Sequence, residues 1–156
     1  MHDRSTFACG EVALDLYLRT QVTQDIRRHI TNCFIAVDTL SGHVAGYYTL
    51  AATSIPLTNL PQSLAKRLPR YPAVPAVRIG RLAIDQQFQG RGLGAASLSN
   101  AAKRTLDAPP AAYALVVDAK NDHAIAFYRH HGFVSFADHP NSLFLPLATF
   151  IKASLS

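Results

Sequence analysis

Acidic residues are scarce in this chain and absent from residues 39–84. Its 156 residues carry 15 lysines and arginines against 10 aspartates and glutamates, giving a formal net charge of +5. No acidic residue lies between Asp38 and Asp85, a stretch that includes Lys66, Arg67 and Arg70. Unopposed positive charge raises the local concentration of anions. The stretch is therefore either a solvated basic face or a docking surface for CoA, nucleic acid or an acidic protein.

Other absences narrow the class of protein further. The two cysteines, Cys9 and Cys33, form no CxxC pair, which argues against a disulfide framework and a zinc site. The seven histidines form no HExxH motif, so no metal is expected. No apolar run reaches the length of a membrane span, and residues 1–5 do not resemble a signal peptide. We expect a cytoplasmic protein with reduced thiols and no membrane partner.

The length and the apolar periodicity predict one α+β domain over residues 1–156. A hydrophobic content of 49% is enough for a packed core. Apolar spacing predicts helices at residues 11–30, 93–106 and 122–131. Strands are expected at residues 33–38, 44–52, 77–84, 113–117, 133–136 and 143–147. Pro61 is expected to start a short helix that carries Lys66 and Arg67 and stops at Pro69.

A glycine-rich turn joins an apolar strand to a helix. It reads Gln89-Gly90-Arg91-Gly92-Leu93-Gly94. The free N–H groups and the positive dipole end at such a helix start suit a phosphate. The alternating glycines let the backbone approach a ligand and take positive φ without steric cost. The turn lacks the Gly-Lys-Ser/Thr of a Walker loop, and it lacks the glycine spacing and downstream acid of a dinucleotide motif.

Together with the later segment Ala-Phe-Tyr-Arg-His-His-Gly-Phe at residues 126–133, this turn resembles the cofactor half of GNAT-fold acetyltransferases. Gln-x-x-Gly-x-Gly is that family's pyrophosphate loop. Segments at residues 7–10, 14–18, 45–50 and 68–72 extend the likeness to nearly the whole chain, and they are similar to the acetyltransferase toxins of bacterial type II toxin–antitoxin modules. The resemblance implies a central mixed, mostly antiparallel twisted sheet flanked by helices.

The resemblance also implies an activity. Such toxins transfer acetyl from acetyl-CoA to the α-amino group of aminoacyl-tRNA and thereby block translation. A ribbon-helix-helix antitoxin neutralises them. The size of tRNA is compatible with a homodimer that shares one basic groove.

Cofactor residues follow from the same resemblance. Backbone groups at Leu82, Ala83 and Ile84 are expected to pair with the pantetheine amides, as an added strand would. The pyrophosphate is expected on Gln89, Gly90, Arg91, Gly92, Leu93 and Gly94. Arg91 is either a phosphate ligand or a solvated loop residue, and the loss of Arg81 or Arg91 is expected to affect acetyl-CoA more than tRNA. Asn121 matches a position that often contacts the cofactor, although a helix N-cap would read the same in sequence.

Tyr128 corresponds to the family's catalytic tyrosine. The reference pKa of a thiol is about 8.5 and that of a phenol about 10, so a positioned tyrosine can donate a proton to a leaving thiolate. The alternative is a helix tyrosine that packs on the sheet beside Phe127 and Phe133.

The glutamate base that many GNAT enzymes place near the central strands is missing, because residues 39–84 contain no acid. Deprotonating a lysine at pH 7 costs roughly 4.6 kcal/mol, whereas an α-amine costs only about 1 kcal/mol. A site without a base therefore suits an aminoacyl ester better than a lysine. A water chain or Asp85 remains an alternative base.

The basic stretch supplies the expected tRNA contacts, which are phosphate contacts by Lys66, Arg67, Arg70 and Arg78. Two other readings stay open. One is a GNAT enzyme that acetylates protein N-termini, lysines or a small amine. The other is a non-catalytic nucleic-acid-binding module, against which the glycine turn and Tyr128 argue because binding a nucleic-acid backbone needs neither.

Overall fold

Helical and extended segments follow one another much as the apolar spacing predicts. The computed structural model describes residues 3–155. The helices are α1 Val12–Leu16, α2 Val22–Arg27, α3 Gln62–Ala65, α4 Leu93–Asp107, α5 Asp122–His130 and α6 Leu147–Leu155. The strands are β1 Asn32–Val37, β2 Val44–Pro56, β3 Ala73–Ile84, β4 Ala114–Asp118, β5 Val134–Ser135 and β6 Ser142–Pro146. A π-helical turn at Tyr17–Gln21 joins α1 to α2, and Leu57–Asn59 and Gln86–Phe88 form short 3-10 turns.

The strands form one six-stranded sheet with the hydrogen-bonded order β1-β2-β3-β4-β6-β5. β1 pairs antiparallel with β2, and β6 pairs antiparallel with both β4 and β5. The expected α+β class, with a mostly antiparallel sheet flanked by helices, is confirmed.

The backbone divides into two compact units. Unit 1 extends to Ala51 and resumes over Ile79–Ala101. Unit 2 contains Ala52–Arg78 and the chain from Ala102 onward. β2, β3 and α4 each contribute residues to both units.

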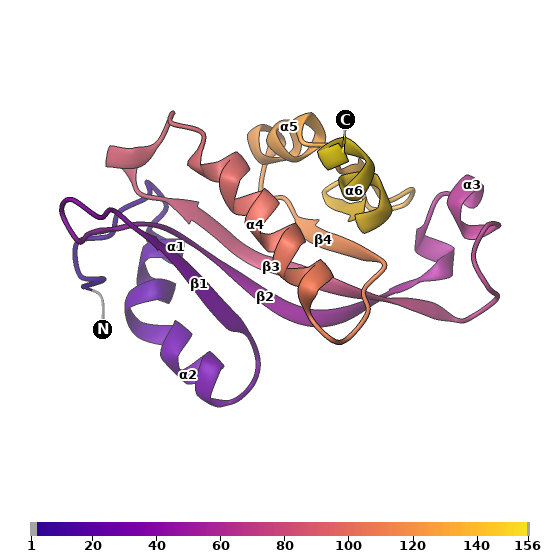
Figure 1. The fold of residues 1–156 in the computed structure, drawn as a ribbon, viewed down its shortest axis with the longest axis horizontal. Helices are drawn as coiled ribbons and strands as arrows, with labels where there is room; N and C mark the ends of the chain where they lie inside the picture. Colours follow the sequence, from indigo (N-terminus) through magenta and orange to yellow (C-terminus); the bar gives the residue numbers. More distant parts are fainter. Residues whose placement is uncertain (1–2, 156) are drawn as a thin grey trace. The chain divides into compact units, whose positions relative to one another are not determined.

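In unit 1, helices cover both faces of the first strands (Figure 1). α1, the π-helical turn and α2 enclose a core formed by Phe7, Tyr17, Leu18, Val22, Val44, Tyr47 and Ala83. A π turn holds one extra residue, which shifts the apolar stripe so that the neighbours Tyr17 and Leu18 are both buried. On the other face Tyr48 stacks on Phe34, and its hydroxyl hydrogen-bonds to Asn100 of α4.

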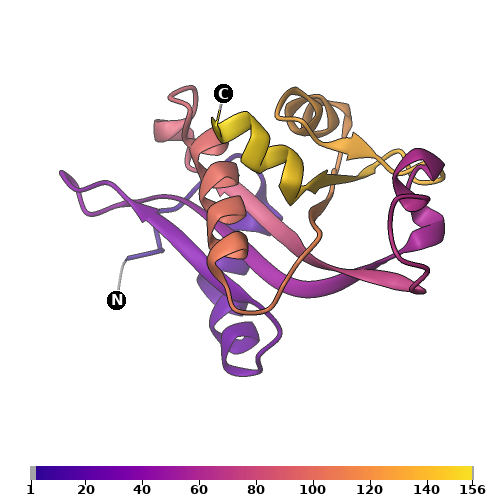
Figure 2. The ribbon, with the colours of Figure 1, turned by 45° about the vertical axis from the view of Figure 1, so that its right-hand side comes forward.

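Unit 2 has its own core, formed by Ile55, Leu60, Val74, Ala76, Ala114, Val116, Phe136 and Phe144. β4 is buried along its apolar length, as a strand covered on both faces should be. Between β2 and β3 lies an excursion, residues 57–72, that carries α3 beyond the ends of the two strands (Figure 2). The Leu57 amide donates to the Pro72 carbonyl at 3.1 Å and closes its base.

Three segments differ from expectation. β3 begins at Ala73 rather than at residue 77, and it includes Pro75, whose exposed position needs no amide donor. α3 ends at Ala65, so Lys66 and Arg67 follow the helix instead of lying on it. The Arg67 amide bonds to the Leu64 carbonyl, a tighter 3-10 geometry on the approach to Pro69.

α6 is a helix where only the end of a strand was expected. The apolar residues of α6 follow directly after β6, so in the sequence they read as a continuation of the apolar strand. Neither α6 nor any other helix within residues 3–155 has the length and apolar character that crossing a bilayer requires.

Gly46 offers a test of this packing. A Cβ at Gly46 would lie 2.8 Å from Ile84 Cδ1 and 3.0 Å from the Ala83 carbonyl oxygen. The backbone oxygen cannot rotate away, so Gly46→Ala should push β2 from β3 and lower the free energy of unfolding by about 1–3 kcal/mol. Urea denaturation of the two proteins measures this difference. An unchanged midpoint with an unchanged slope would show that β2 and β3 lie farther apart.

Candidate active site

The glycine turn is open and leads directly into a long helix. Gly90 and Gly92 both have φ of +79°, the left-handed region that favours glycine. A Cβ added at either residue would meet no atom within 4 Å. α4 starts at Leu93, and its first hydrogen bond runs from the Ala96 amide to the Gly92 carbonyl. The backbone can therefore approach a phosphate closely at the positive end of a 15-residue helix.

Gln89 holds the turn in place with its side chain. Its Nε2 donates to the carbonyl oxygens of Cys9 at 2.9 Å and Ile84 at 2.8 Å. Because the amide nitrogen is engaged in these two bonds, the Gln89 side chain is an anchor for the turn. Any contact with a pyrophosphate falls to its backbone N–H.

Asp85 is the second anchor. It is 8% exposed, and one carboxylate oxygen accepts from the Ala8 amide at 3.0 Å while the other accepts from the Gln87 amide at 2.9 Å. The Gln86 amide in turn donates to the Ala8 carbonyl at 2.9 Å. Asp85 was an alternative for the general base, but both oxygens are committed to backbone donors. Its structural role is to bind the N-terminal segment to the end of β3.

The central-strand residues expected to face pantetheine alternate in burial. Ala83 belongs to the core of unit 1, whereas Leu82 and Ile84 are half-buried. After Ile84, the Asp85 amide donates to the Ala45 carbonyl at 2.8 Å, so β3 remains paired with β2 up to the anchor. Arg91 extends from the turn over the Phe88 ring, with its guanidinium carbon 5.5 Å from the ring centroid.

In unit 2, Tyr128 lies on α5 with its ring against Phe133 and Phe127, at centroid distances of 5.3 Å in both cases. Burial raises the pKa of Tyr128 to about 12. Its hydroxyl has no hydrogen-bond partner among the described residues. Among the described residues, every polar side-chain atom that is buried from solvent has a hydrogen-bond partner. Because the Tyr128 hydroxyl has no such partner, it is accessible to solvent. Tyr128 is thus a neutral hydrogen-bond donor with a packed ring.

Asn121 is the N-cap of α5. Its side-chain oxygen accepts from the Ala124 amide at 2.9 Å. The capping role that the sequence allowed is therefore present, and only the Nδ2 group remains for a cofactor.

The basic residues of the excursion point outward because leucines hold its inner side. Leu57, Leu64 and Leu68 pack against the core of unit 2. Lys66, Arg67 and Arg70 are exposed and make no ion pair or side-chain hydrogen bond with another described residue. Next to them lies Tyr71, 63% exposed, which was not among the expected tRNA contacts. An exposed ring beside arginines is a platform on which a nucleobase can stack.

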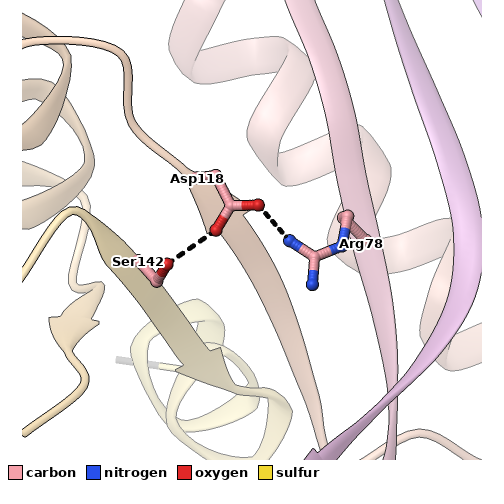
Figure 3. Close-up of polar contacts among 3 residues, drawn as sticks. All are labelled: Arg78, Asp118 and Ser142. Atoms are coloured by element: carbon pink, nitrogen blue, oxygen red, sulfur yellow. Dashed lines mark hydrogen bonds and ion pairs between the residues drawn. The ribbon is translucent and has the colours of Figure 1, made fainter. Parts of the chain in front are cut away.

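Arg78 differs from the other basic residues. Its guanidinium forms an ion pair with Asp118 at the end of β4, and the Ser142 hydroxyl donates to the other carboxylate oxygen at 2.7 Å (Figure 3). Asp118 compensates the charge of Arg78, so a phosphate would have to compete with it.

The cysteines lack the character of nucleophiles. Burial raises the pKa of Cys9 and of Cys33 to about 11 in each case, so both remain thiols at neutral pH. Within residues 3–155, no three His, Cys, Asp or Glu side chains gather as metal ligands would.

Comparisons with known proteins agree with this geometry. Residues 5–133 match the Acetyltransferase (GNAT) family. A tRNA-acetylating toxin of Mycobacterium tuberculosis is 35% identical over 133 residues, which cover 84% of this chain and 78% of the relative.

Two solved structures of AtaT carry the likeness further. AtaT complexed with acetyl-methionyl-tRNAfMet superposes with a TM-score of 0.87 at 33% identity, covering 99% of this chain and 93% of that one. A mutant AtaT toxin bound to the C-terminus of the antitoxin AtaR and acetyl-CoA gives a TM-score of 0.81 at 28% identity, covering 100% and 92%. The open glycine turn at a helix start, the tyrosine of α5 and a family match over most of the chain lead to one conclusion: this protein belongs to the GNAT acetyltransferases, among the tRNA-acetylating toxins.

Proposed function

We propose that this protein transfers acetyl from acetyl-CoA to the α-amino group of aminoacyl-tRNA in the cytoplasm and so blocks translation. The observation that carries the proposal is the likeness, over 99% of the chain, to AtaT in complex with an acetylated methionyl-tRNA. The family match crosses both units, which supports one GNAT domain over residues 1–156.

Acetyl-CoA supplies the acetyl group as a thioester, and the open turn fits its pyrophosphate. Backbone N–H groups from Gln89 to Gly94 would hold the phosphates, with Arg91 as a further cation. Leu82, Ala83 and Ile84 would hold the pantetheine amides along β3. The Nδ2 of Asn121 is the remaining candidate contact.

Tyr128 would serve the departing sulfur as a proton donor. A pKa of about 12 makes its phenol a weak acid. Complete transfer to a thiolate with a reference pKa of about 8.5 would be uphill by roughly 5 kcal/mol. Tyr128 therefore acts first as a hydrogen-bond donor, and it passes its proton to sulfur as the attacking nitrogen gives one up. The C–N bond forms as the C–S bond breaks, and the proton that the amine releases to water returns through solvent to the Tyr128 phenolate. The amine thus loses one proton, the thiol gains one, and Tyr128 ends the step protonated.

No committed base is needed for this substrate. The α-amine of an aminoacyl ester costs about 1 kcal/mol or less to deprotonate at pH 7, and water can accept that proton. Asp85 is unsuited to the task because two backbone amides occupy its carboxylate. A lysine would need roughly 4.6 kcal/mol, which disfavours the protein-lysine alternative.

The excursion, residues 57–72, is the proposed tRNA contact. Lys66, Arg67 and Arg70 offer exposed cations for phosphates, and Tyr71 adds a stacking surface. Arg78 joins them only when its pair with Asp118 opens. The same positive surface would attract the acidic or amphipathic segment of a ribbon-helix-helix antitoxin and explain inhibition by occlusion.

One experiment separates this function from the alternatives. In vitro translation is run with and without acetyl-CoA, and the aminoacyl-tRNA pool is then analysed by mass. Acetylated aminoacyl-tRNA together with acetyl-CoA-dependent arrest supports the proposal. Arrest without acetyl-CoA would favour a non-catalytic binder, and unmodified tRNA with acetylated protein or amine would favour another GNAT substrate.

Gly92→Val tests the cofactor turn. A β-branched residue at φ +79° is strained, and its side chain would fill the space in which the pyrophosphate is proposed to lie. We expect acetyl-CoA affinity, measured by calorimetry, to fall at least tenfold. Gly42→Val is the matched control, because Gly42 has φ +77° and equally open surroundings in a different turn. Gly42→Val should lose comparable stability and keep its affinity; equal affinity in both variants would contradict the assignment.

Tyr128→Phe tests the proton donor. It keeps the ring that packs against Phe133 and removes only the hydroxyl. We expect kcat to fall by a factor of about 100 or more while acetyl-CoA affinity is kept. Because burial raises the pKa of Tyr128 to about 12, the wild-type protein should keep this donor protonated up to at least pH 10. A variant that turns over at the wild-type rate would make Tyr128 a packing residue.

Lys66→Ala, Arg67→Ala and Arg70→Ala test the tRNA surface. If each cation contacts a phosphate, each change should weaken tRNA binding and make its dependence on salt shallower. The expected change is somewhat under one unit of log–log slope per lost contact. Affinity is measured across a salt series, with Lys152→Ala on α6 as a control of equal charge. Slopes identical to wild type in all three variants would place tRNA elsewhere.

A further inference from the structure

Arg81 lies stacked on an aromatic ring instead of in solvent. Its guanidinium carbon is 3.5 Å from the ring centroid of Tyr17, which belongs to the π-helical turn. The Tyr17 hydroxyl donates to Asp25 at 2.7 Å, and Gln21 donates to the other oxygen of Asp25 at 3.1 Å. The ring is therefore fixed from its far end, and it holds the guanidinium in one orientation.

This guanidinium has unused hydrogen-bonding capacity. Arg81 is half-buried, and its side chain makes no hydrogen bond or ion pair with another described residue. An arginine offers five N–H donors in a planar fork. Hydrogen bonds from Tyr17 and Gln21 to its two oxygens lower the pKa of Asp25, and the nearby charge of Arg81 lowers it further. A preoriented, partly desolvated guanidinium with free donors is a site for a phosphate or a carboxylate.

The position of Arg81 on β3 indicates which anion it meets. Its amide donates to the hydroxyl oxygen of Thr49 on β2 at 3.0 Å. If the pyrophosphate lies on residues 89–94 and pantetheine follows residues 84 to 82, the thioester end comes to lie next to Arg81. The anion expected there belongs to the acceptor and not to the cofactor. In an aminoacyl-tRNA, one ribose separates the ester from the last phosphodiester.

We propose that Arg81, held by Tyr17, binds a phosphodiester of the 3′-terminal Cyt-Cyt-Ade of the acceptor tRNA and so places the α-amine at the thioester. This inference rests on the proposed function. It replaces the sequence-based expectation that loss of Arg81 would affect acetyl-CoA more than tRNA. Arg81 is a specificity-determining residue for a nucleic-acid acceptor, because free amines and protein lysines carry no such phosphate.

The first test compares steady-state kinetics on a charged RNA minihelix. For Arg81→Gln we expect KM for the minihelix to rise at least tenfold, while acetyl-CoA affinity stays within twofold of wild type. Arg81→Lys keeps the charge but loses the fork and the stack, so it should recover only part of the loss. Arg27→Gln on α2 removes one exposed charge and should change KM less than twofold. An unchanged KM for Arg81→Gln, or a loss confined to acetyl-CoA affinity, would overturn the inference.

The second test identifies the phosphate and guards against misfolding. Minihelices carry a neutral methylphosphonate at one of the last two linkages. In wild type, the correct neutral linkage should raise KM as much as Arg81→Gln does. In Arg81→Gln, it should cause no further loss, whereas additive losses would show that Arg81 acts elsewhere. Thermal melting and acetyl-CoA binding of each variant confirm the fold. If the wild-type protein does not acetylate the unmodified minihelix at all, the proposed function itself is wrong. That result is distinct from a failure of the Arg81 inference, in which the wild type is active and Arg81→Gln leaves KM unchanged.

Discussion

The candidate site depends on one carboxylate that holds two distant parts of the chain. Asp85 accepts backbone amides from Ala8 and from Gln87, and Gln89 adds a bond to the Cys9 carbonyl. These bonds tie the N-terminal segment to the end of β3, where the backbone turns sharply through Gly90 and Gly92. A buried charge with two amide donors is costly to disturb, because removing it leaves those donors unsatisfied. The open shape of the turn is therefore imposed by its anchors and not by the glycines alone.

The sequence predicted what depends on local pattern. Helical spacing located the segments that became α1, α2, α4 and α5, and the glycine spacing located the turn. Asn121 was identified as a cap or a cofactor contact, and the cap is present. Other features depend on partners far away in sequence. The sequence near Arg78 does not predict its ion pair with Asp118, 40 residues later. The sequence near Arg81 likewise does not predict its stacking on Tyr17. Such pairs follow from sheet order and register, which periodicity does not determine.

The buried environment of Tyr128 changes its acidity. An ordinary tyrosine could exchange its proton readily at alkaline pH, whereas burial raises the pKa of this one to about 12. As the proposed proton donor, Tyr128 would stay protonated at physiological pH, at the cost of acid strength. Such a residue works best when the proton it gives up is replaced in the same event. The proposed mechanism is consequently suited to an amine that loses its proton easily, as the amine of an aminoacyl ester does.

In the excursion between β2 and β3, the inward-facing and outward-facing residues have different structural roles. Its leucines reach the core of unit 2, and the Leu57–Pro72 hydrogen bond closes its base. The outward positions, including Lys66, Arg67, Arg70 and Tyr71, bear little of the packing. A change at these positions alters which anionic surface the protein prefers without requiring a new fold. If the excursion contacts tRNA as proposed, a few substitutions there could change the preferred RNA while the acetyl-transfer site is kept.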